Sequence, residues 1–156
     1  METTELLSDY ELERGKPMPG RNHGLIQSRL SFLLLRDYEN EYDFLAESSL
    51  ELTTGKATPD LAVYPKLPRD WFNDEVRMTT PPLSVFEILS PTQGLQDLTD
   101  KAATYFGAGV QSYWVIIPTF KTVHLILPNQ PINTVTAGII TDPATRIVVQ
   151  TTEIFK

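Results

Sequence analysis

The sequence contains no cysteine among its 156 residues. Disulfide bonds and thiolate metal sites are therefore excluded, and a reducing compartment such as the cytoplasm is the expected location. The chain also lacks a long apolar run, and residues 1–5 are acidic where a secretion signal would carry basic residues. Neither secretion nor membrane insertion is supported, so no membrane partner is expected.

Basic residues are in the minority. The chain has 13 Lys and Arg residues against 20 Asp and Glu residues, which gives a formal net charge of −7. Phosphate binding relies mostly on Lys and Arg, so this balance counts against a nucleic-acid partner. The objection weakens if several of the acids gather around divalent cations, because a bound metal is then the largest local charge.

Several common site motifs are also missing. The sequence has no Gly-rich phosphate loop, no dinucleotide fingerprint and no Gly-x-Ser-x-Gly elbow. Its two histidines, His23 and His124, share no metal-ligand spacing, and His124 lies in a β-rich segment where a structural role is expected. The chemistry of this chain must therefore be sought among its carboxylates.

The length and composition are those of an ordinary globular protein, and we expect a single domain over residues 1–156. No internal repeat or low-complexity tract divides the chain.

The N-terminal third predicts a strand or hairpin near Tyr10 to Pro17, followed by a helix. Apolar residues recur every three or four positions from Asn22 to about Tyr38, which indicates an amphipathic helix capped by Asn22. Residues 44–53 alternate as a strand does, and residues 54–56 supply turn chemistry. A second strand at residues 60–64 is expected to pair with the first in antiparallel fashion.

The remaining two thirds predict a long loop from Pro65 to Pro82 and then a regular series of elements. Residues 83–89 form a continuous apolar strand of the kind found inside a sheet, and a helix follows from Leu95 to about Phe106. Residues 112–117 and 122–127 read as a hairpin, and the tail has no clear organisation. Together these elements predict a mixed central β-sheet flanked by helices, an α/β (α+β) fold.

Two acidic residues stand in apolar surroundings. Asp60 precedes the apolar run at residues 61–64, and Glu87 interrupts the apolar strand at residues 83–89. A carboxylate in such a place is costly to desolvate unless a cation or a hydrogen-bond donor meets it. If the two strands are neighbours, the pair is a candidate metal site.

The helix after Glu87 adds a base. Asp97, Lys101 and Tyr105 are four residues apart and so share one helical face. The bland interpretation is an Asp97–Lys101 surface ion pair worth a few tenths of a kcal/mol, roughly 0.3. The functional interpretation is a lysine that enters the site of Asp60 and Glu87.

These residues, taken in order, resemble a known family. Pro59-Asp60, Glu87 with the following Ser90-Pro91, Lys101 and Tyr113-Trp114 are similar to the Uma-two family of candidate restriction endonucleases, within the PD-(D/E)XK nuclease superfamily. The similarity covers roughly residues 10–118 and is strongest over residues 82–118. It implies a restriction-endonuclease-like fold and divalent-metal-dependent hydrolysis of DNA.

The resemblance also implies roles for individual residues. Asp60 and Glu87 would bind Mg²⁺ or Mn²⁺, and the backbone carbonyl of Ile88 would complete the ligands, since Mg²⁺ prefers oxygen and keeps several waters. Lys101 would orient the attacking water or neutralise charge in the transition state. A homodimer is compatible with this function, because cleavage of two strands requires two sites.

Two positions depart from the family's pattern. The simplest superfamily motif has a lysine two residues after the second acid, where this chain has Leu89. The resemblance implies that Lys101 of the following helix has taken over that function. Ile117 stands where the family usually has an acid before the proline.

Other polar residues have weaker claims. Glu11 matches a family acid but is expected to be an exposed strand residue, and Glu47 is a reserve ligand that could face Asp60 from the paired strand. His23 matches a family histidine, with a surface position as the bland alternative. Tyr113 and Trp114 are expected to pack in the core rather than stack on bases.

Two functions from different classes therefore stand. The first is a metal-dependent endonuclease acting on DNA through Asp60, Glu87 and Lys101. The second is a non-catalytic interaction module that keeps the nuclease fold, which the acidic charge, Ile117 and the displaced lysine favour. Binding of a divalent cation through Asp60 distinguishes them.

Overall fold

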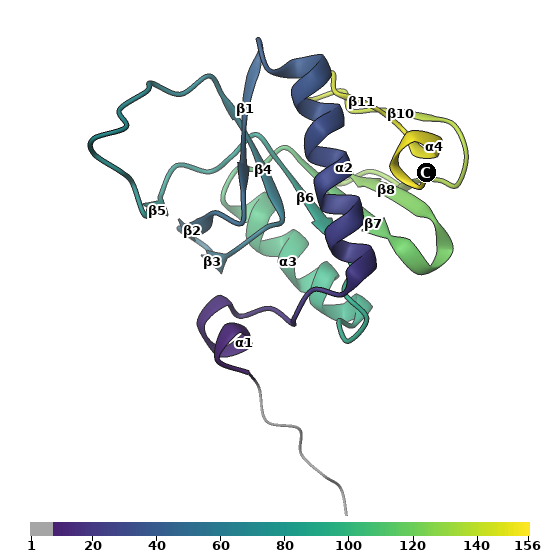
Figure 1. Ribbon diagram of the computed structural model, residues 1–156, viewed down its shortest axis with the longest axis horizontal. Coiled ribbons are helices and arrows are strands. Elements are labelled where there is room, and N and C mark those ends of the chain that lie inside the picture. The colour runs from purple at the N-terminus through teal and green to yellow at the C-terminus, as the bar shows by residue number, and fades with distance from the viewer. Residues whose placement is uncertain (1–7) are drawn as a thin grey trace, which may run out of the picture.

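The computed structural model describes residues 8–156, and its main feature is a six-stranded sheet (Figure 1). The strand order is β1-β4-β6-β7-β8-β9. The strands are β1 (Tyr42–Ala46), β4 (Leu61–Pro65), β6 (Ser84–Ile88), β7 (Ser112–Ile117), β8 (Thr122–Ile126) and β9 (Asn133–Val135). Only β6 and β7 pair in parallel within this sheet. The sheet is therefore mixed, as the sequence predicts.

Two helices cover the sheet from opposite sides (Figure 1). Both α2 (Arg21–Tyr38) and α3 (Leu95–Gly107) lie where the apolar periodicity predicts a helix. The N-cap of α2 is Gly20, without a side-chain cap, so the predicted cap at Asn22 is wrong by two residues. Asn22 already belongs to the first turn, because the chain enters the helix directly after Gly20.

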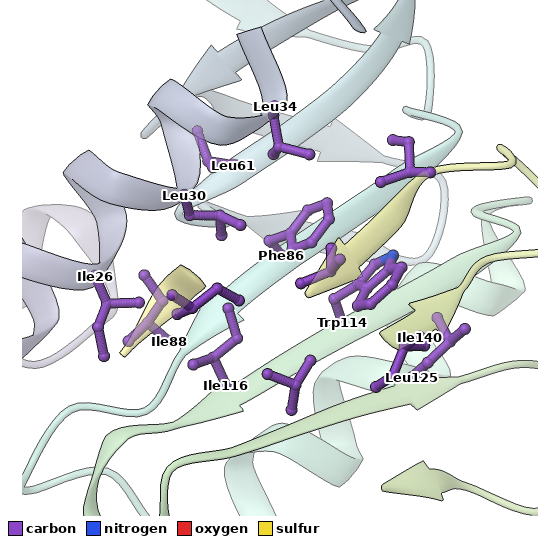
Figure 2. Packing of buried hydrophobic residues seen from close by; sticks show 14 of the residues in the cluster. Ile26, Leu30, Leu34, Leu61, Phe86, Ile88, Trp114, Ile116, Leu125 and Ile140 are labelled. Atoms are coloured by element: carbon purple, nitrogen blue, oxygen red, sulfur yellow. The ribbon is translucent and has the colours of Figure 1, made fainter. Parts of the chain in front are cut away.

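The core on the α2 side is built around aromatic and aliphatic side chains of the central strands (Figure 2). Leu30 of α2 is fully buried against this face, and Phe86 and Trp114 stack with ring centroids 5.0 Å apart. Burial of each such side chain contributes about 1.5–3 kcal/mol. Trp114 therefore packs in the core, as predicted.

The second core lies between the sheet and α3. Strands alternate their side chains, so Val85, Tyr113 and Val115 point to this face, where Leu98 and Tyr105 of α3 meet them. The helix α3 connects the parallel strands β6 and β7, which explains why both read as continuous apolar runs. Glu87 is the one acidic residue in β6.

The N-terminal segment differs from its prediction. Instead of a strand or hairpin, residues 9–14 form the helix α1 (Asp9–Arg14), which ends at Gly15 in the left-handed conformation (φ 66°). Ser8 and Glu11 form a reciprocal capping box, and this local hydrogen bonding starts a helix where a strand or hairpin is predicted. Glu11 is thus a helix-capping residue and not an exposed strand residue. Residues 1–7 lie outside the described part of the chain.

The strand predicted over residues 44–53 is in fact two strands. β1 ends at Ala46, and Glu47 adopts a positive φ of 55°, which breaks the extended backbone. β2 (Ser49–Leu52) then joins a separate sheet with β3 (Gly55–Ala57) and β5 (Arg77–Met78). The predicted antiparallel pairing of the first strand with β4 is confirmed. β5 is a short strand within the region predicted as a loop.

The chain ends in a small appendage to the main sheet. The 3₁₀ helix η1 (Pro118–Phe120) joins β7 to β8, which pair as the predicted hairpin. β10 (Ile139–Thr141) and β11 (Val148–Gln150) form a two-stranded sheet, and α4 (Thr151–Ile154) packs on α2. Among the helices over residues 8–156, none has the length and apolar character needed to cross a bilayer.

Candidate active site

Asp60 lies immediately before β4, and its carboxylate is almost completely buried, with 2 % of the residue exposed. One oxygen, Oδ2, accepts a hydrogen bond from the Ile88 backbone N–H at 2.7 Å. The other, Oδ1, lies 2.7 Å from Lys16 Nζ and 3.0 Å from His23 Nε2. Both oxygens of this buried carboxylate are therefore met by donors from three different segments.

The environment keeps Asp60 ionised. Burial raises the pKa of a carboxyl group, but the hydrogen bond with His23, the charge of Lys16 and the Ile88 N–H outweigh it. The result is a pKa for Asp60 lowered to about 2. The site thus contains a permanent negative charge at neutral pH.

Glu87 points from the centre of β6 toward α3 and is 3 % exposed. Its Oε1 accepts a hydrogen bond from the Tyr105 hydroxyl at 2.7 Å. Its Oε2 accepts from the Tyr113 hydroxyl at 3.1 Å and from Lys101 Nζ at 3.2 Å. Burial, followed by the Glu87 charge, raises the pKa of both tyrosines, so they remain protonated donors.

The predicted helical face of α3 is partly confirmed. Lys101 and Tyr105 are one turn apart and both contact Glu87. Asp97 is exposed, and among the described residues it forms no ion pair with Lys101. The simple Asp97–Lys101 pair is therefore wrong, and Lys101 turns toward the buried acid.

The two acids meet where β4 and β6 lie side by side. In the antiparallel register Leu61 faces Phe86, so the next position places Asp60 opposite Glu87. The contact from Ile88 N–H to Asp60 fixes this neighbourhood. The structure thus places Asp60 and Glu87 at neighbouring backbone positions, and Lys101 contacts Glu87 and not Asp60. That the three form one site stays a prediction.

The donor set fits a hard cation in type. Carboxylates and backbone carbonyls are oxygen ligands, and Mg²⁺ is commonly bound through one or two carboxylates with the rest supplied by water and substrate. Over residues 8–156, no three His, Cys, Asp or Glu side chains form a metal-binding group. A cation at Asp60 would also compete with Lys16 for Oδ1. Ile88 contacts Asp60 through its N–H, and the role of its carbonyl as a ligand stays a prediction.

Lys16 is the residue that the sequence did not reveal. Its side chain is 9 % exposed and donates to Asp60 Oδ1, Glu47 Oε2 at 3.2 Å and the Thr58 carbonyl at 3.1 Å. Burial would lower the pKa of Lys16, but the charges and hydrogen bonds of Asp60 and Glu47 raise it. In sequence, Gly15-Lys16-Pro17 carries only a turn signal, so nothing local indicates this position.

Glu47 and His23 both belong to this neighbourhood. Glu47 donates its backbone N–H to the Asp60 carbonyl at 3.2 Å, and its carboxylate pairs with Lys16 and Arg14. His23 is 3 % exposed, so the surface alternative is wrong. Gln27, one turn after His23, donates to the Asp60 carbonyl at 3.3 Å. α2 therefore contributes two side chains that contact Asp60, one at its carboxylate and one at its backbone carbonyl.

Two further residues have structural positions. His124 lies on β8 with its ring nitrogens 2.9 Å and 2.8 Å from the hydroxyls of Thr122 and Thr134, as expected of a structural histidine. Ile117 is buried at the end of β7, on the α3 side of the sheet. The position before Pro118, where the family usually has an acid, is thus part of the apolar core.

Comparison with known proteins gives a family and a fold. A family model described as "Putative restriction endonuclease", Uma2, matches residues 2–150. A crystal structure of a putative nuclease of the DUF820 group from Anabaena variabilis has a TM-score of 0.78 and 23% identity, covering 90% of this chain and 83% of that one. The cryo-EM structure of a DrdV–DNA complex has a TM-score of 0.49 and 15% identity, covering 81% and 77%, which is too weak to carry an argument. None of the curated proteins matches the chain.

The first of these structures shares the fold, which is of the restriction-endonuclease type. The family and the fold together support nuclease function in general. With the family model covering nearly the whole length, the chain belongs to the Uma2 family of restriction endonuclease-like proteins.

Proposed function

We propose that this protein is a divalent-metal-dependent endonuclease that hydrolyses phosphodiester bonds of DNA. The observation that supports this most is the placement of two buried carboxylates, Asp60 directly before β4 and Glu87 in the neighbouring β6, with the ammonium of Lys101 against Glu87. Buried acids that serve only packing are rare, because desolvating a charge is costly. Two carboxylates that can bind a cation, together with a lysine that can stabilise negative charge, are the groups that this reaction uses.

Asp60, Glu87 and the Ile88 carbonyl are the groups that would bind Mg²⁺ or Mn²⁺. Such a cation polarises phosphate oxygens and lowers the pKa of bound water. The chain itself supplies the charge and the orientation. Tyr105 and Tyr113 fix the Glu87 carboxylate, and the Ile88 N–H fixes that of Asp60.

Lys101 is the lysine assigned to the reacting phosphate. Its side chain is 25% exposed, so its ammonium can reach both Glu87 and a substrate outside the protein. Lys16 is enclosed by three acceptors and is assigned to Asp60 itself. The two lysines therefore have separate roles: Lys101 stabilises developing negative charge on the phosphate, and Lys16 neutralises Asp60.

The test is cleavage of supercoiled plasmid with Mg²⁺ or Mn²⁺. We expect cation-dependent nicking, and we expect Asp60→Asn, Glu87→Gln and Lys101→Met each to reduce the rate by about a hundredfold or more. Asp97→Asn, on the same helix but exposed, is the matched control and should cleave as the unmodified protein does. Intact plasmid with both cations, together with no heat of cation binding, would overturn the proposal.

A non-catalytic interaction module is the second candidate, because both acids already have internal partners. Asp60 and Glu87 each accept three hydrogen bonds from the protein. Titration of Mn²⁺ by calorimetry separates the two candidates. If Asp60 binds cations, Lys16→Met removes the competing ammonium and should tighten Mn²⁺ binding by about tenfold, or about 1.4 kcal/mol. A purely structural pair predicts no binding by either protein.

A further inference from the structure

The cationic side chains of this acidic chain divide into two groups. All 13 Lys and Arg residues lie within residues 8–156. Eight of them form salt bridges with Asp or Glu: Arg14, Lys16, Arg36, Lys56, Lys66, Arg69, Arg77 and Lys101. The other five, which have no such partner among the described residues, are Arg21, Arg29, Lys121, Arg146 and Lys156. All five are exposed.

Four of these five line a group of three adjoining hollows around the exposed side of α2, which we describe as one groove. Arg21 and Arg29 lie on the outer side of α2, Lys121 follows η1, and Lys156 follows α4. Three adjoining hollows make up the groove: two share Arg29, and two share Asn22. α2 packs against both η1 and α4, which fixes the groove walls. We call this surface the α2–η1 groove.

The α2–η1 groove is free of acidic side chains. No Asp or Glu residue lines any of its three hollows, although the chain has 20 acids and a net charge of −7. By contrast, the hollow beside Lys101 is lined by Asp97 and Asp100. An exposed concave surface that concentrates unpaired cations within an acidic protein favours an anionic partner.

The groove also leads to the candidate active site. Its inner hollow is lined by Arg21, His23 and Leu89. His23 contacts Asp60, and Leu89 directly follows Ile88, whose N–H contacts the same carboxylate. A polyanion that follows the groove toward this end therefore reaches the surface formed by His23 and Leu89, behind which Asp60 is buried.

We propose that the α2–η1 groove binds the sugar–phosphate backbone of the nucleic acid substrate, with Arg21, Arg29, Lys121 and Lys156 each neutralising phosphate charge. This inference rests on the proposed function and adds to it the surface that positions the substrate. The acidic remainder of the protein repels the polyanion, so the groove is the surface that attracts it first. The negative net charge is thus compatible with nucleic acid binding.

The test measures binding separately from cleavage. Fluorescence anisotropy of a labelled DNA duplex, without added divalent cation, gives the dissociation constant over a series of salt concentrations. Each phosphate contact adds about 0.9 to the salt slope, so the double variant Arg29→Ala/Lys121→Ala should lower the slope by about 2 and weaken binding by about tenfold or more. Arg146→Ala, an unpaired exposed arginine outside the groove, is the matched control and should change neither quantity.

The outcomes distinguish the groove from the nuclease proposal. An unmodified protein that does not bind the duplex, or a double variant with unchanged slope, overturns the groove even if plasmid is cleaved. Equal losses in the double variant and in Arg146→Ala also overturn it, because binding would then depend on overall charge alone. If the double variant binds weakly and the unmodified protein binds without ever cleaving, the groove stands and the nuclease proposal fails. Urea unfolding of each variant verifies that the fold is intact.

Discussion

At the scale of single residues, Asp60 shows how a buried charge is retained. Its two oxygens receive an ammonium, an imidazole and a backbone N–H, so the cost of desolvation is offset by three charge-assisted contacts. Removing one partner of such a cluster leaves the others buried without compensation. Asp60 and Lys16 should therefore each be sensitive to substitution, independently of any catalytic role.

The pKa of Asp60 gives a stability prediction with a defined sign. The folded state lowers the pKa to about 2 from the ordinary 3.8, so ionised Asp60 contributes stability above pH 3.8 that is lost as the pH falls toward 2. A shift of this size corresponds to roughly 2 kcal/mol. We expect Asp60→Asn to lower the free energy of unfolding at pH 7 by about that amount or more.

Urea unfolding at several pH values between 7 and 2 checks this expectation. The difference between the unmodified protein and Asp60→Asn should shrink as the pH falls from 4 to 2. Asp97→Asn, at an exposed position, should give no such pH-dependent difference. A difference that stays constant over this range would mean that the charge of Asp60 does not stabilise the fold.

The residues of the site were predictable to different degrees. Glu87 can be identified from its immediate neighbours, because an acid inside a continuous apolar strand is unusual. Lys16 and His23 lie 44 and 37 positions before Asp60, and neither carries a local pattern that indicates the contact. Partners of a buried charge that come from distant segments are fixed by the fold, and a single sequence does not contain that distance information.

At the scale of elements, a third buried acid holds the C-terminal appendage to the sheet. Asp142, between β10 and β11, is fully buried and contacts no cation within residues 8–156. Its Oδ2 accepts from the Ser112 hydroxyl, from Trp114 Nε1 at 3.3 Å and from the Thr145 hydroxyl at 3.0 Å. Its Oδ1 accepts the Ala144 N–H at 2.8 Å. These bonds tie the β10–β11 turn to β7.

Replacing Asp142 with Ala should therefore destabilise the protein. Several buried donors would lose their acceptor at once, and each unsatisfied group costs about 1–3 kcal/mol, so we expect a total loss of at least about 3 kcal/mol. Chemical denaturation measures it, with Asp97→Ala as the exposed control. If Asp142→Ala loses less than about 1 kcal/mol more unfolding free energy than Asp97→Ala does, water has replaced the carboxylate as the acceptor.

The helices and strands also differ in how far the local sequence predicts them. α2, α3 and the strands β6, β7 and β8 are marked by a strong apolar period or a continuous apolar run, and the sequence predicts them. The break after Ala46 depends on one residue, Glu47, in a conformation that Glu rarely adopts. The tail forms β10, β11 and α4 because Asp142 and its neighbours dock on β7, a tertiary contact that periodicity does not report.

At the scale of the whole molecule, the average charge conceals its distribution. A net charge of −7 argues against nucleic acid only if the charges are spread evenly. In the described part of the chain most cations are paired with acids, while four of the five unpaired ones line the α2–η1 groove. Composition gives the sum of charges, and function depends on their placement.

The two cores share one sheet, which leads to a prediction about cooperativity. The cluster containing Leu30 and Trp114 and the cluster containing Leu98 lie on opposite faces of the same central strands. Loss of either cluster exposes the other side of β6 and β7, so the protein should unfold as a single domain in one transition. Either Leu30→Ala or Leu98→Ala should lower the free energy of unfolding by about 2–5 kcal/mol.

The measurement uses the two tryptophans of the chain. Trp71 is 91 % exposed and Trp114 is fully buried. After the substitution Trp71→Phe, Trp114 is the one remaining tryptophan, so tryptophan fluorescence reports on the α2 face alone. Far-UV circular dichroism reports on the helices of both faces. In this background, fluorescence and ellipticity should give the same urea midpoint, and Leu98→Ala, on the far face from Trp114, should move both midpoints equally. If fluorescence and ellipticity give different urea midpoints in Leu98→Ala, the two faces of the sheet unfold independently. The core beneath α2 would then not be stabilised by the core on the Glu87 side.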